Sequence, residues 1–292
     1  MNDFVFYKKR KFGDLISDTF TFFRKYAGNY FSNYLVINGA AIVSAGILFT
    51  VMAFFLPSLS GGFGTSLLLV LLMLVIVFFL FLFVFCFPIA YTELLEKNPN
   101  RIDIASQELL ESIKKMMPRA FLFGFISIFV IWIPYLLVSF GLASILGNAP
   151  FLLQLASYFL STLLFLFMQQ AMLLYIKDRE GYFQALGKVV NQLKERFWDK
   201  FGATFVMNII CSLIVVAGAI IPLVIYFLTL AVSGFELGLG TAILVFVLLL
   251  IVVTVTFVSL NLPLFQQILI HLGEKEDQHT DDIDLIGKNV EE

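Results

Sequence analysis

The fold is decided by one long stretch without a charged residue. It reads YAGNYFSNYLVINGAAIVSAGILFTVMAFFLPSLSGGFGTSLLLVLLMLVIVFFLFLFVFCFPIAYT and covers residues 26–92. A single helix needs only about 20 apolar residues to cross a bilayer, so this stretch is too long for one span. A glycine-rich and serine-rich segment at residues 58–66 is typical of a turn. The stretch therefore predicts a hairpin of two membrane-spanning helices, residues 34–56 and 67–88.

Two further stretches repeat this arrangement. Residues 120–176 carry no charge, and residues 201–273 carry only Glu236. Turn signals rich in glycine lie at residues 140–150 and 233–240. The apolar runs are continuous and lack the alternation of a barrel strand, which favours helices. We therefore expect an all-α membrane protein with six transmembrane helices in three hairpins, the later spans lying at residues 120–139, 151–176, 203–230 and 241–270.

The charged residues are few and lie on one side. Of 292 residues 60% are hydrophobic and 14% are charged, against about 25% charged in an ordinary soluble domain. All 19 Lys and Arg lie before the first span, between the second and third, between the fourth and fifth, or after the sixth. Because Lys and Arg are retained in the cytoplasm, both termini are predicted there, in a multi-pass protein of the bacterial inner membrane. The net charge of −2 gives no reason to expect a nucleic-acid partner.

The three hairpins are preceded by similar segments. Residues 12–31, 102–121 and 182–201 align without gaps, with basic residues and then phenylalanines at equivalent positions. Apolar residues recur three or four apart, which predicts an amphipathic helix on the cytoplasmic side before each hairpin. We interpret the chain as a threefold internal repeat. Its predicted parts are a basic N-terminal segment at 1–11, units at 12–100, 101–179 and 180–273, and an acidic flexible tail at 274–292.

The amphipathic segments allow three interpretations. They lie in the membrane interface, or they pack on one another as the floor of a six-helix bundle, or they form a docking surface for a partner protein. In the first case their basic side chains face lipid head groups. The expected head-group contacts are Arg24, Lys25, Lys114, Lys115, Lys194 and Arg196.

The polar side chains inside the spans are few and are the candidate functional residues. They either hold helices together through interhelical hydrogen bonds or line a polar groove near the cytoplasmic ends of the spans. The two uses differ in whether the amides face a neighbouring helix or an open space. These candidates are Asn38, Tyr91, Gln169, Gln170, Asn208, Gln266 and Gln267.

No pattern in the sequence predicts catalysis, a metal site or a cofactor. The spans contain no acidic or basic residue, the two histidines are His271 and His279, and Cys86 and Cys211 fall in different spans. Metal sites and nucleophilic sites need clusters of such side chains at fixed spacing. We therefore expect a protein that is not an enzyme and has no cofactor, metal-binding or catalytic residue.

The N-terminal sequence YKKRKFGDLISDTFTFFR, residues 7–24, carries a family resemblance. It resembles the start of uncharacterised six-span inner-membrane proteins of the Bacteroidota type. Their layout is similar to that of the membrane domain of some glycerophosphodiester phosphodiesterases. The resemblance implies an inner-membrane location and carries over no catalytic residue, because residues 274–292 offer no counterpart of the catalytic barrel of those enzymes.

Together these patterns lead to two functional hypotheses. The first is a scaffold or accessory subunit without enzymatic activity that interacts with membrane lipids or with a membrane-protein partner. The second is a transporter or flippase-like conduit for an amphiphilic or lipid substrate. The sequence gives no oligomeric state.

Overall fold

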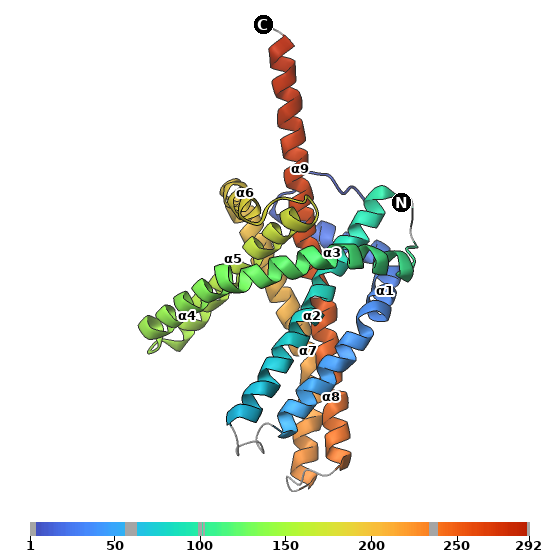
Figure 1. The fold of residues 1–292 in the computed structure, drawn as a ribbon, viewed down its shortest axis with the longest axis vertical. Coiled ribbons are helices and arrows are strands. Elements are labelled where there is room, and N and C mark those ends of the chain that lie inside the picture. The colour runs from blue at the N-terminus through green and yellow to red at the C-terminus, as the bar shows by residue number, and fades with distance from the viewer. Residues whose placement is uncertain (1–3, 56–62, 99–100, 102, 234–238, 291–292) are drawn as a thin grey trace.

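The computed structural model describes residues 4–55, 63–98, 101, 103–233 and 239–290, and all regular structure in this part of the chain is helical. Ten helical segments follow one another (Figure 1). They are α1 (Phe12–Phe55), α2 (Phe63–Lys97), α3 (Ser106–Ser127), the π-helical η2 (Ile128–Trp132), α4 (Ile133–Leu146), α5 (Pro150–Ile176), α6 (Tyr182–Lys194), α7 (Phe197–Ser233), α8 (Leu239–Ser259) and α9 (Asn261–Val290).

The first predicted amphipathic helix is continuous with the first span. α1 is a single helix of 44 residues, and no Gly or Pro lies between Phe31 and Asn38 to end it. Helix propagation is cooperative, and α1 also continues through Gly28, Gly39 and Gly46. In the third unit the backbone does break, because α6 ends at Lys194 and Arg196 has a positive φ of 54°. The structure therefore differs from the prediction of a separate helix before each hairpin.

The second hairpin starts with a continuous helical path that contains a π-turn. α3, η2 and α4 follow one another without a gap, and the N–H of Ile133 donates to the carbonyl of Ile128 five residues earlier. Pro134 lies directly after the π-turn. Proline removes one helical hydrogen bond and collides with the preceding turn, and the wider π-turn relieves that collision. α4 continues to Leu146, so the turn predicted at 140–150 is shorter than expected.

Five stretches of the described chain are long and apolar enough to cross a membrane. The predicted second span, residues 67–88, lies within α2, most of whose apolar side chains fall outside the described ones. Six spans and a threefold repeat therefore stay predictions. Parts of the predicted turns at 58–66 and 233–240, including Glu236, also lie outside the described residues. The five stretches are Phe12–Thr50, Ser106–Leu146, Pro150–Ile176, Phe197–Thr229 and Ile243–Glu276.

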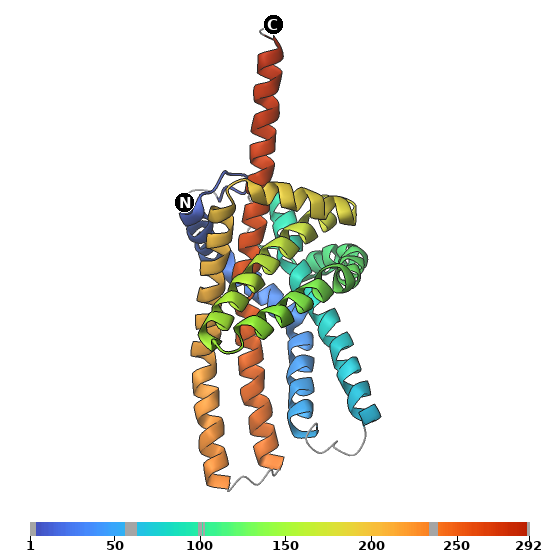
Figure 2. The ribbon, with the colours of Figure 1, turned by 90° about the vertical axis from the view of Figure 1, so that its left-hand side faces the viewer.

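The helices form three arms that meet at a common junction, beyond which the C-terminal part of α9 projects (Figure 1). Two arms, α1 with α2 and α7 with α8, point in the same direction (Figure 2). The third arm, α4 with the first part of α5, crosses them steeply and projects away (Figure 1). α4 has no buried residue. The described charged residues up to Glu276 lie where the arms meet, in residues 4–25, 93–119, 177–200 and 271–276, which we call the charged end. The charged residues at 277–288 follow on the part of α9 that projects beyond it.

A cluster of aromatic side chains in the core adjoins the charged end. Phe22 of α1 stacks on Phe265 of α9 with ring centroids 3.7 Å apart. Tyr30 meets the rings of Phe87 and Tyr91 from α2 edge-on, at 5.1 and 4.8 Å. Such pairs are worth about 0.5–1.5 kcal/mol each beyond the area that they bury. These contacts join the first two helices to α9. The helical backbone of α9 then continues through Val290, and the flexibility of this tail stays a prediction.

Candidate functional site

Three of the predicted polar residues, Gln170, Gln266 and Gln267, lie between helices. The side-chain amide of Gln170 on α5 donates to both the backbone carbonyl and Oε1 of Gln267 on α9, each at 2.9 Å. Gln267 in turn donates to Oγ1 of Thr204 on α7 at 2.9 Å. The neighbouring Gln266 donates to the carbonyl of Ala203, also on α7, at 3.2 Å. All these side chains are buried. We call Gln170, Thr204, Gln266 and Gln267 the amide cluster, and it ties α5 and α7 to α9.

A second set of polar contacts ties α1 to α2 and to the junction of α8 and α9. Tyr91 of α2 donates to Oδ1 of Asn29 at 3.0 Å. Tyr30 donates to Oδ1 of Asn261 at 2.7 Å, and Tyr34 donates to the carbonyl of Phe257 at 3.0 Å. Since a buried hydroxyl is costly without a partner, these bonds fix how α1 sits against its neighbours.

The other three candidates make weaker or local contacts. Asn208 on α7 reaches Oγ1 of Thr162 on α5 at 3.5 Å. Asn38 is fully buried and donates to the carbonyl of Tyr34 in its own helix at 3.2 Å. Its Oδ1 has no hydrogen-bond partner among the described residues. Gln169 is buried beside Gln170. The seven candidates therefore lie in the interior rather than around one open cavity.

Two buried lysines hold the charged end together. Lys177, which follows α5, lies 2.6 Å from Oε1 of Glu96 on α2, and both side chains are nearly buried. Lys200 on α7 lies 2.7 Å from Oε1 of Glu274 on α9. Tyr7 donates to Oε2 of Glu96 at 3.3 Å. Burial, together with the charge of Glu96, raises the pKa of Tyr7 to about 12, so its hydroxyl stays a donor.

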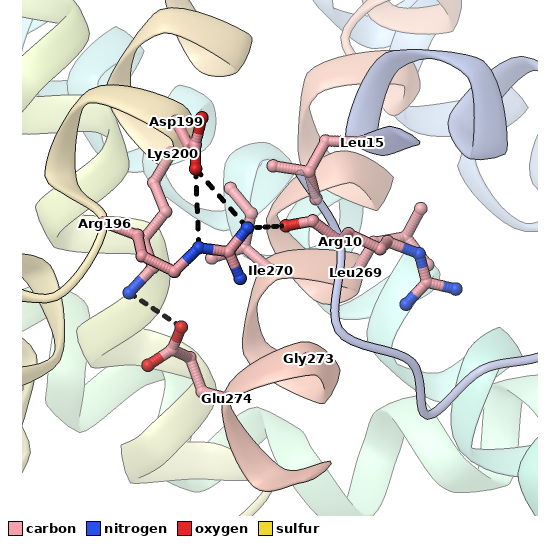
Figure 3. A pocket seen from close by; sticks show the side chains of 9 residues that line it. All are labelled: Arg10, Leu15, Arg196, Asp199, Lys200, Leu269, Ile270, Gly273 and Glu274. Atoms are coloured by element: carbon pink, nitrogen blue, oxygen red, sulfur yellow. Dashed lines mark hydrogen bonds and ion pairs between the residues drawn. The ribbon is translucent and has the colours of Figure 1, made fainter. Parts of the chain in front are cut away.

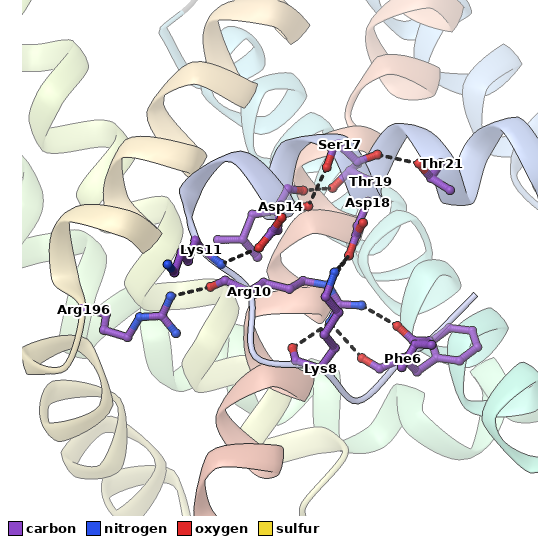
Figure 4. Close-up of polar contacts among 12 residues, drawn as sticks. Phe6, Lys8, Arg10, Lys11, Asp14, Ser17, Asp18, Thr19, Thr21 and Arg196 are labelled. Atoms are coloured by element: carbon purple, nitrogen blue, oxygen red, sulfur yellow. Dashed lines mark hydrogen bonds and ion pairs between the residues drawn. The ribbon is translucent and has the colours of Figure 1, made fainter. Parts of the chain in front are cut away.

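The N-terminal segment is fastened by Arg10 (Figure 4). The guanidinium, only 1% exposed, lies 2.9 Å from Asp18 and donates to the carbonyls of Val5, Phe6 and Lys8. Burial lowers the pKa of Arg10, and Asp18 opposes that shift. The backbone carbonyl of Arg10 accepts a hydrogen bond of 2.7 Å from Arg196.

The cavity beneath this segment is too small for a ligand. It lies between the N-terminal segment, α7 and α9 (Figure 3) and has a volume of about 20 Å³. A cavity of that size holds about one water molecule. Its walls include the Lys200–Glu274 and Arg196–Asp199 ion pairs. The residues around this cavity therefore hold the N-terminal segment, α7 and α9 together.

Asp178 connects the α5–α6 loop to α9. Its Oδ1 lies 2.5 Å from Nζ of Lys275, and its Oδ2 lies 3.3 Å from Nε2 of His271. Burial raises the pKa of Asp178, but the hydrogen bond and charge of His271 and those of Lys275 outweigh burial. The pKa of Asp178 therefore lies below its ordinary value.

One larger concavity opens at the charged end between α2, α3 and the end of α5. Its volume is about 400 Å³, within the range of roughly 300–1,000 Å³ usual for small-molecule sites. We call it the α2–α3 groove. Its apolar wall is formed by Leu94, Met116 and Ile176. Its charged and polar wall consists of Glu93, Lys97, Glu108, Glu111, Ser112, Lys115, Arg119, Lys177 and Arg179.

The six basic residues expected at lipid head groups differ in their surroundings. Arg24, Lys114, Lys115 and Lys194 are exposed. Lys25 is partly buried with its ammonium 5.2 Å from the centre of the Tyr26 ring. Arg196 is engaged inside the molecule, with Asp199 and the carbonyl of Arg10. Of the six, Lys115 alone is part of the α2–α3 groove.

Sequence reasoning missed the residues that make the charged end rigid. Asn29 and Asn33 both donate to the carbonyl of Ile104, at 3.3 and 2.9 Å, and Ser106 donates to Asn33. Their spacing of one helical turn within an aromatic segment is a signal that one face of α1 is polar. No comparable signal marks Arg10 or Lys177 as buried, since their partners are set by the tertiary fold.

No family model, no curated protein and no solved structure matches this chain, and its candidate site is therefore defined by its own geometry.

Proposed function

We propose that this chain is an integral protein of the bacterial inner membrane that acts as a scaffold or accessory subunit without enzymatic activity. In this proposal six spans in three repeated units cross the membrane. The charged end and both termini are cytoplasmic. The ligands are membrane lipids or a membrane-protein partner, and they are bound at the charged end.

The observation that carries the proposal is the engagement of the buried amides with neighbouring helices. The amide of Gln170 donates to α9, and the amides of Gln266 and Gln267 donate to α7. All three side chains are buried. A conduit for an amphiphile needs polar side chains that face a passage. Hydrogen bonds between helices instead stabilise one arrangement of spans, by about 0.6–2 kcal/mol each. This use of the amides favours the scaffold over the transporter or flippase.

The arrangement of the arms supports the orientation. Both ends of the described chain lie beyond the same end of the arms (Figure 1), as an even number of crossings requires. Every described Lys and Arg except Lys288, which lies farther along α9, belongs to the charged end, and retention of such residues in the cytoplasm would orient it inward. The far ends of the arms carry exposed apolar side chains such as Leu137, Ile221 and Phe227, which suit contact with lipid.

The test separates the scaffold from the conduit. The full chain is reconstituted in liposomes that contain fluorescent phospholipids, and transfer between leaflets is followed by quenching from outside. A scaffold leaves the transfer rate at that of protein-free liposomes. Acceleration in proportion to the amount of protein would overturn the proposal in favour of the conduit.

A companion experiment looks for the partner. The chain is extracted in native lipid discs, and mass spectrometry compares its lipids and proteins with those of the bulk membrane. The scaffold proposal expects a particular lipid or protein to be enriched. If the lipids and the proteins of the discs both match those of the bulk membrane, no ligand is bound and the proposal is wrong.

A further inference from the structure

The α2–α3 groove contains charged groups that the fold does not use. Among the residues that the structure describes, Lys115, Arg179 and Glu111 make no hydrogen bond or ion pair. The other charged groups of the groove are engaged: Lys97 with Glu93, Lys177 with Glu96 and Glu108 with Arg101. The groove therefore presents two free cations and one free carboxylate to whatever enters it.

A third cation that lines this groove, Arg119, is held in position by hydrogen bonds. Arg119 donates from Nε to the carbonyl of Tyr175 at 3.0 Å and from Nη2 to the carbonyl of Glu180 at 2.9 Å. Its guanidinium also lies 4.4 Å from the centre of the Tyr175 ring. These contacts fix the plane of the guanidinium, and Nη1 makes no hydrogen bond to the described residues. A preorganised guanidinium next to an ammonium is suited to a phosphate.

The carboxylate is what distinguishes this groove from a simple anion site. Glu111 lies one helical turn before Lys115 on the face of α3 that lines the groove. A ligand with only negative charge would be repelled by Glu111. A ligand that carries a phosphate and, a few bonds away, an ammonium satisfies the cations and the carboxylate together.

The position of the groove indicates that such a ligand belongs to the membrane. Arg119 and Lys177 line the groove, and they also flank the uncharged residues 120–176. The groove thus lies at the boundary between charged and apolar surface, which is the depth of lipid head groups. Leu122 follows Arg119 by three residues on α3 and is 46% exposed, and Phe125 beyond it is 49% exposed. An acyl chain that leaves the groove along α3 would contact these side chains.

We propose that the α2–α3 groove binds the head group of a phospholipid that carries both a phosphate and an amine, with Lys115, Arg119 and Arg179 on the phosphate and Glu111 on the ammonium. This inference rests on the proposed membrane role, because it needs the charged end to lie at a bilayer surface. It adds the class of lipid and the residues that select it.

The test measures lipid binding to the full chain in detergent by native mass spectrometry. Phosphatidylethanolamine and phosphatidylglycerol with the same acyl chains are titrated in parallel. The double variant Lys115→Ala/Arg179→Ala is expected to bind both lipids about fivefold or more weakly than the unaltered chain. The matched control is Lys114→Ala/Lys194→Ala, which removes the same charge from exposed positions outside the groove. Because these two side chains can attract head groups only in a general way, the control is expected to weaken binding much less than the groove variant does. Equal weakening by both double variants would show general attraction to basic surface and overturn the site.

Selectivity is tested separately with Glu111→Gln. The unaltered chain is expected to prefer phosphatidylethanolamine over phosphatidylglycerol by about threefold or more, and Glu111→Gln is expected to abolish the preference. An unchanged preference would overturn the assignment of the amine to Glu111. Because all three altered residues are exposed, an unchanged Tm confirms that a loss of binding is not a loss of fold.

A competition arm identifies the source of the ligand. Free glycerophosphoethanolamine carries the same phosphate and amine without acyl chains. It is expected not to displace the lipid at equal concentration, and displacement would show that the groove binds a soluble ligand and overturn the lipid assignment. Accelerated lipid transfer in liposomes with intact groove binding would refute the scaffold but leave this inference. Loss of the lipid preference of the groove without accelerated transfer would refute this inference and leave the scaffold proposal.

Discussion

Nζ of Lys177 lies 2.6 Å from Oε1 of Glu96, although 81 residues separate them in the chain. The pair joins the end of α5 to the end of α2, and the two side chains are 9% and 12% exposed. An ion pair at this depth has lost most of its hydration, so each partner depends on the other. The contact therefore links the third arm to the first at the charged end.

Glu96→Ala is expected to lower the free energy of unfolding by about 3–5 kcal/mol, because it leaves Lys177 buried without a counter-charge. The measurement is thermal unfolding of the full chain in detergent. The control is Glu93→Ala, whose partner Lys97 is 61% exposed and whose loss should cost at most about 1 kcal/mol. If the double variant Glu96→Ala/Lys177→Met regains more than half of the stability that Glu96→Ala loses, the unpaired Lys177 is confirmed as the cause. Equal losses in Glu96→Ala and Glu93→Ala would contradict it.

Gln267→Met is expected to destabilise the protein by about 1–2 kcal/mol, because it removes the side-chain acceptor of the Gln170 amide and the donor to the hydroxyl of Thr204. Unfolding in detergent measures the effect. Gln154→Met is the matched control, since Gln154 is exposed on α5 and its replacement should change stability by less than about 0.5 kcal/mol. Lipid transfer in liposomes should be the same for both variants, and a change in transfer confined to Gln267→Met would speak for a polar passage.

Arg10→Ala is expected to free the N-terminal segment from the rest of the charged end. It removes the hydrogen bonds to the carbonyls of Val5, Phe6 and Lys8 and the ion pair with Asp18, at a cost of roughly 2–3 kcal/mol. Amide hydrogen exchange of residues 4–11 should become faster, while exchange in α5 stays the same. Lys11→Ala changes an exposed side chain nearby and should leave exchange unaltered. Equal exchange in both variants would mean that Arg10 does not fasten the segment.

Asp178 should make stability depend on pH in the acidic range. Since its folded pKa lies below its ordinary value, its contribution is fully present above the unfolded pKa and is lost as pH falls through the folded pKa. Asp178→Asn should therefore be less stable than the unaltered chain at pH 7, by roughly 1–3 kcal/mol. This difference should shrink as the pH falls below about 3.9. The check is the Tm of both proteins from pH 7 down to pH 3, and a difference that grows toward acid would refute the assignment.

The orientation is tested with an impermeant thiol reagent on intact cells. Cys86 and Cys211 are both buried, so labelling reports on introduced cysteines. Ser60→Cys should be labelled from outside, whereas Ser112→Cys in the α2–α3 groove should be labelled only after the cells are opened. The reverse pattern would show that the charged end faces outward.

The sequence alone determined the helical class, the apolar segments and the sidedness of the charges. These features depend on local composition, because an apolar run of sufficient length forms a helix in any membrane protein and Lys and Arg mark its ends. The positions of the apolar helices agree with the charge-free stretches even where the boundaries moved, as in α4. The break before α7 and the continuity of α1 were not predictable from periodicity, since an amphipathic pattern does not show where a helix ends.

Only the tertiary structure decided which polar groups meet. Gln170 and Gln267 are 97 residues apart, and their hydrogen bond depends on the packing of α5 against α9. The same holds for the α2–α3 groove, whose walls come from three separate helices. In the sequence, Lys115 and Lys177 are equivalent basic residues beside a span. The fold pairs Lys177 with Glu96 and leaves Lys115 open to a ligand, because burial and the nearest counter-charge are properties of the assembled helices rather than of the chain.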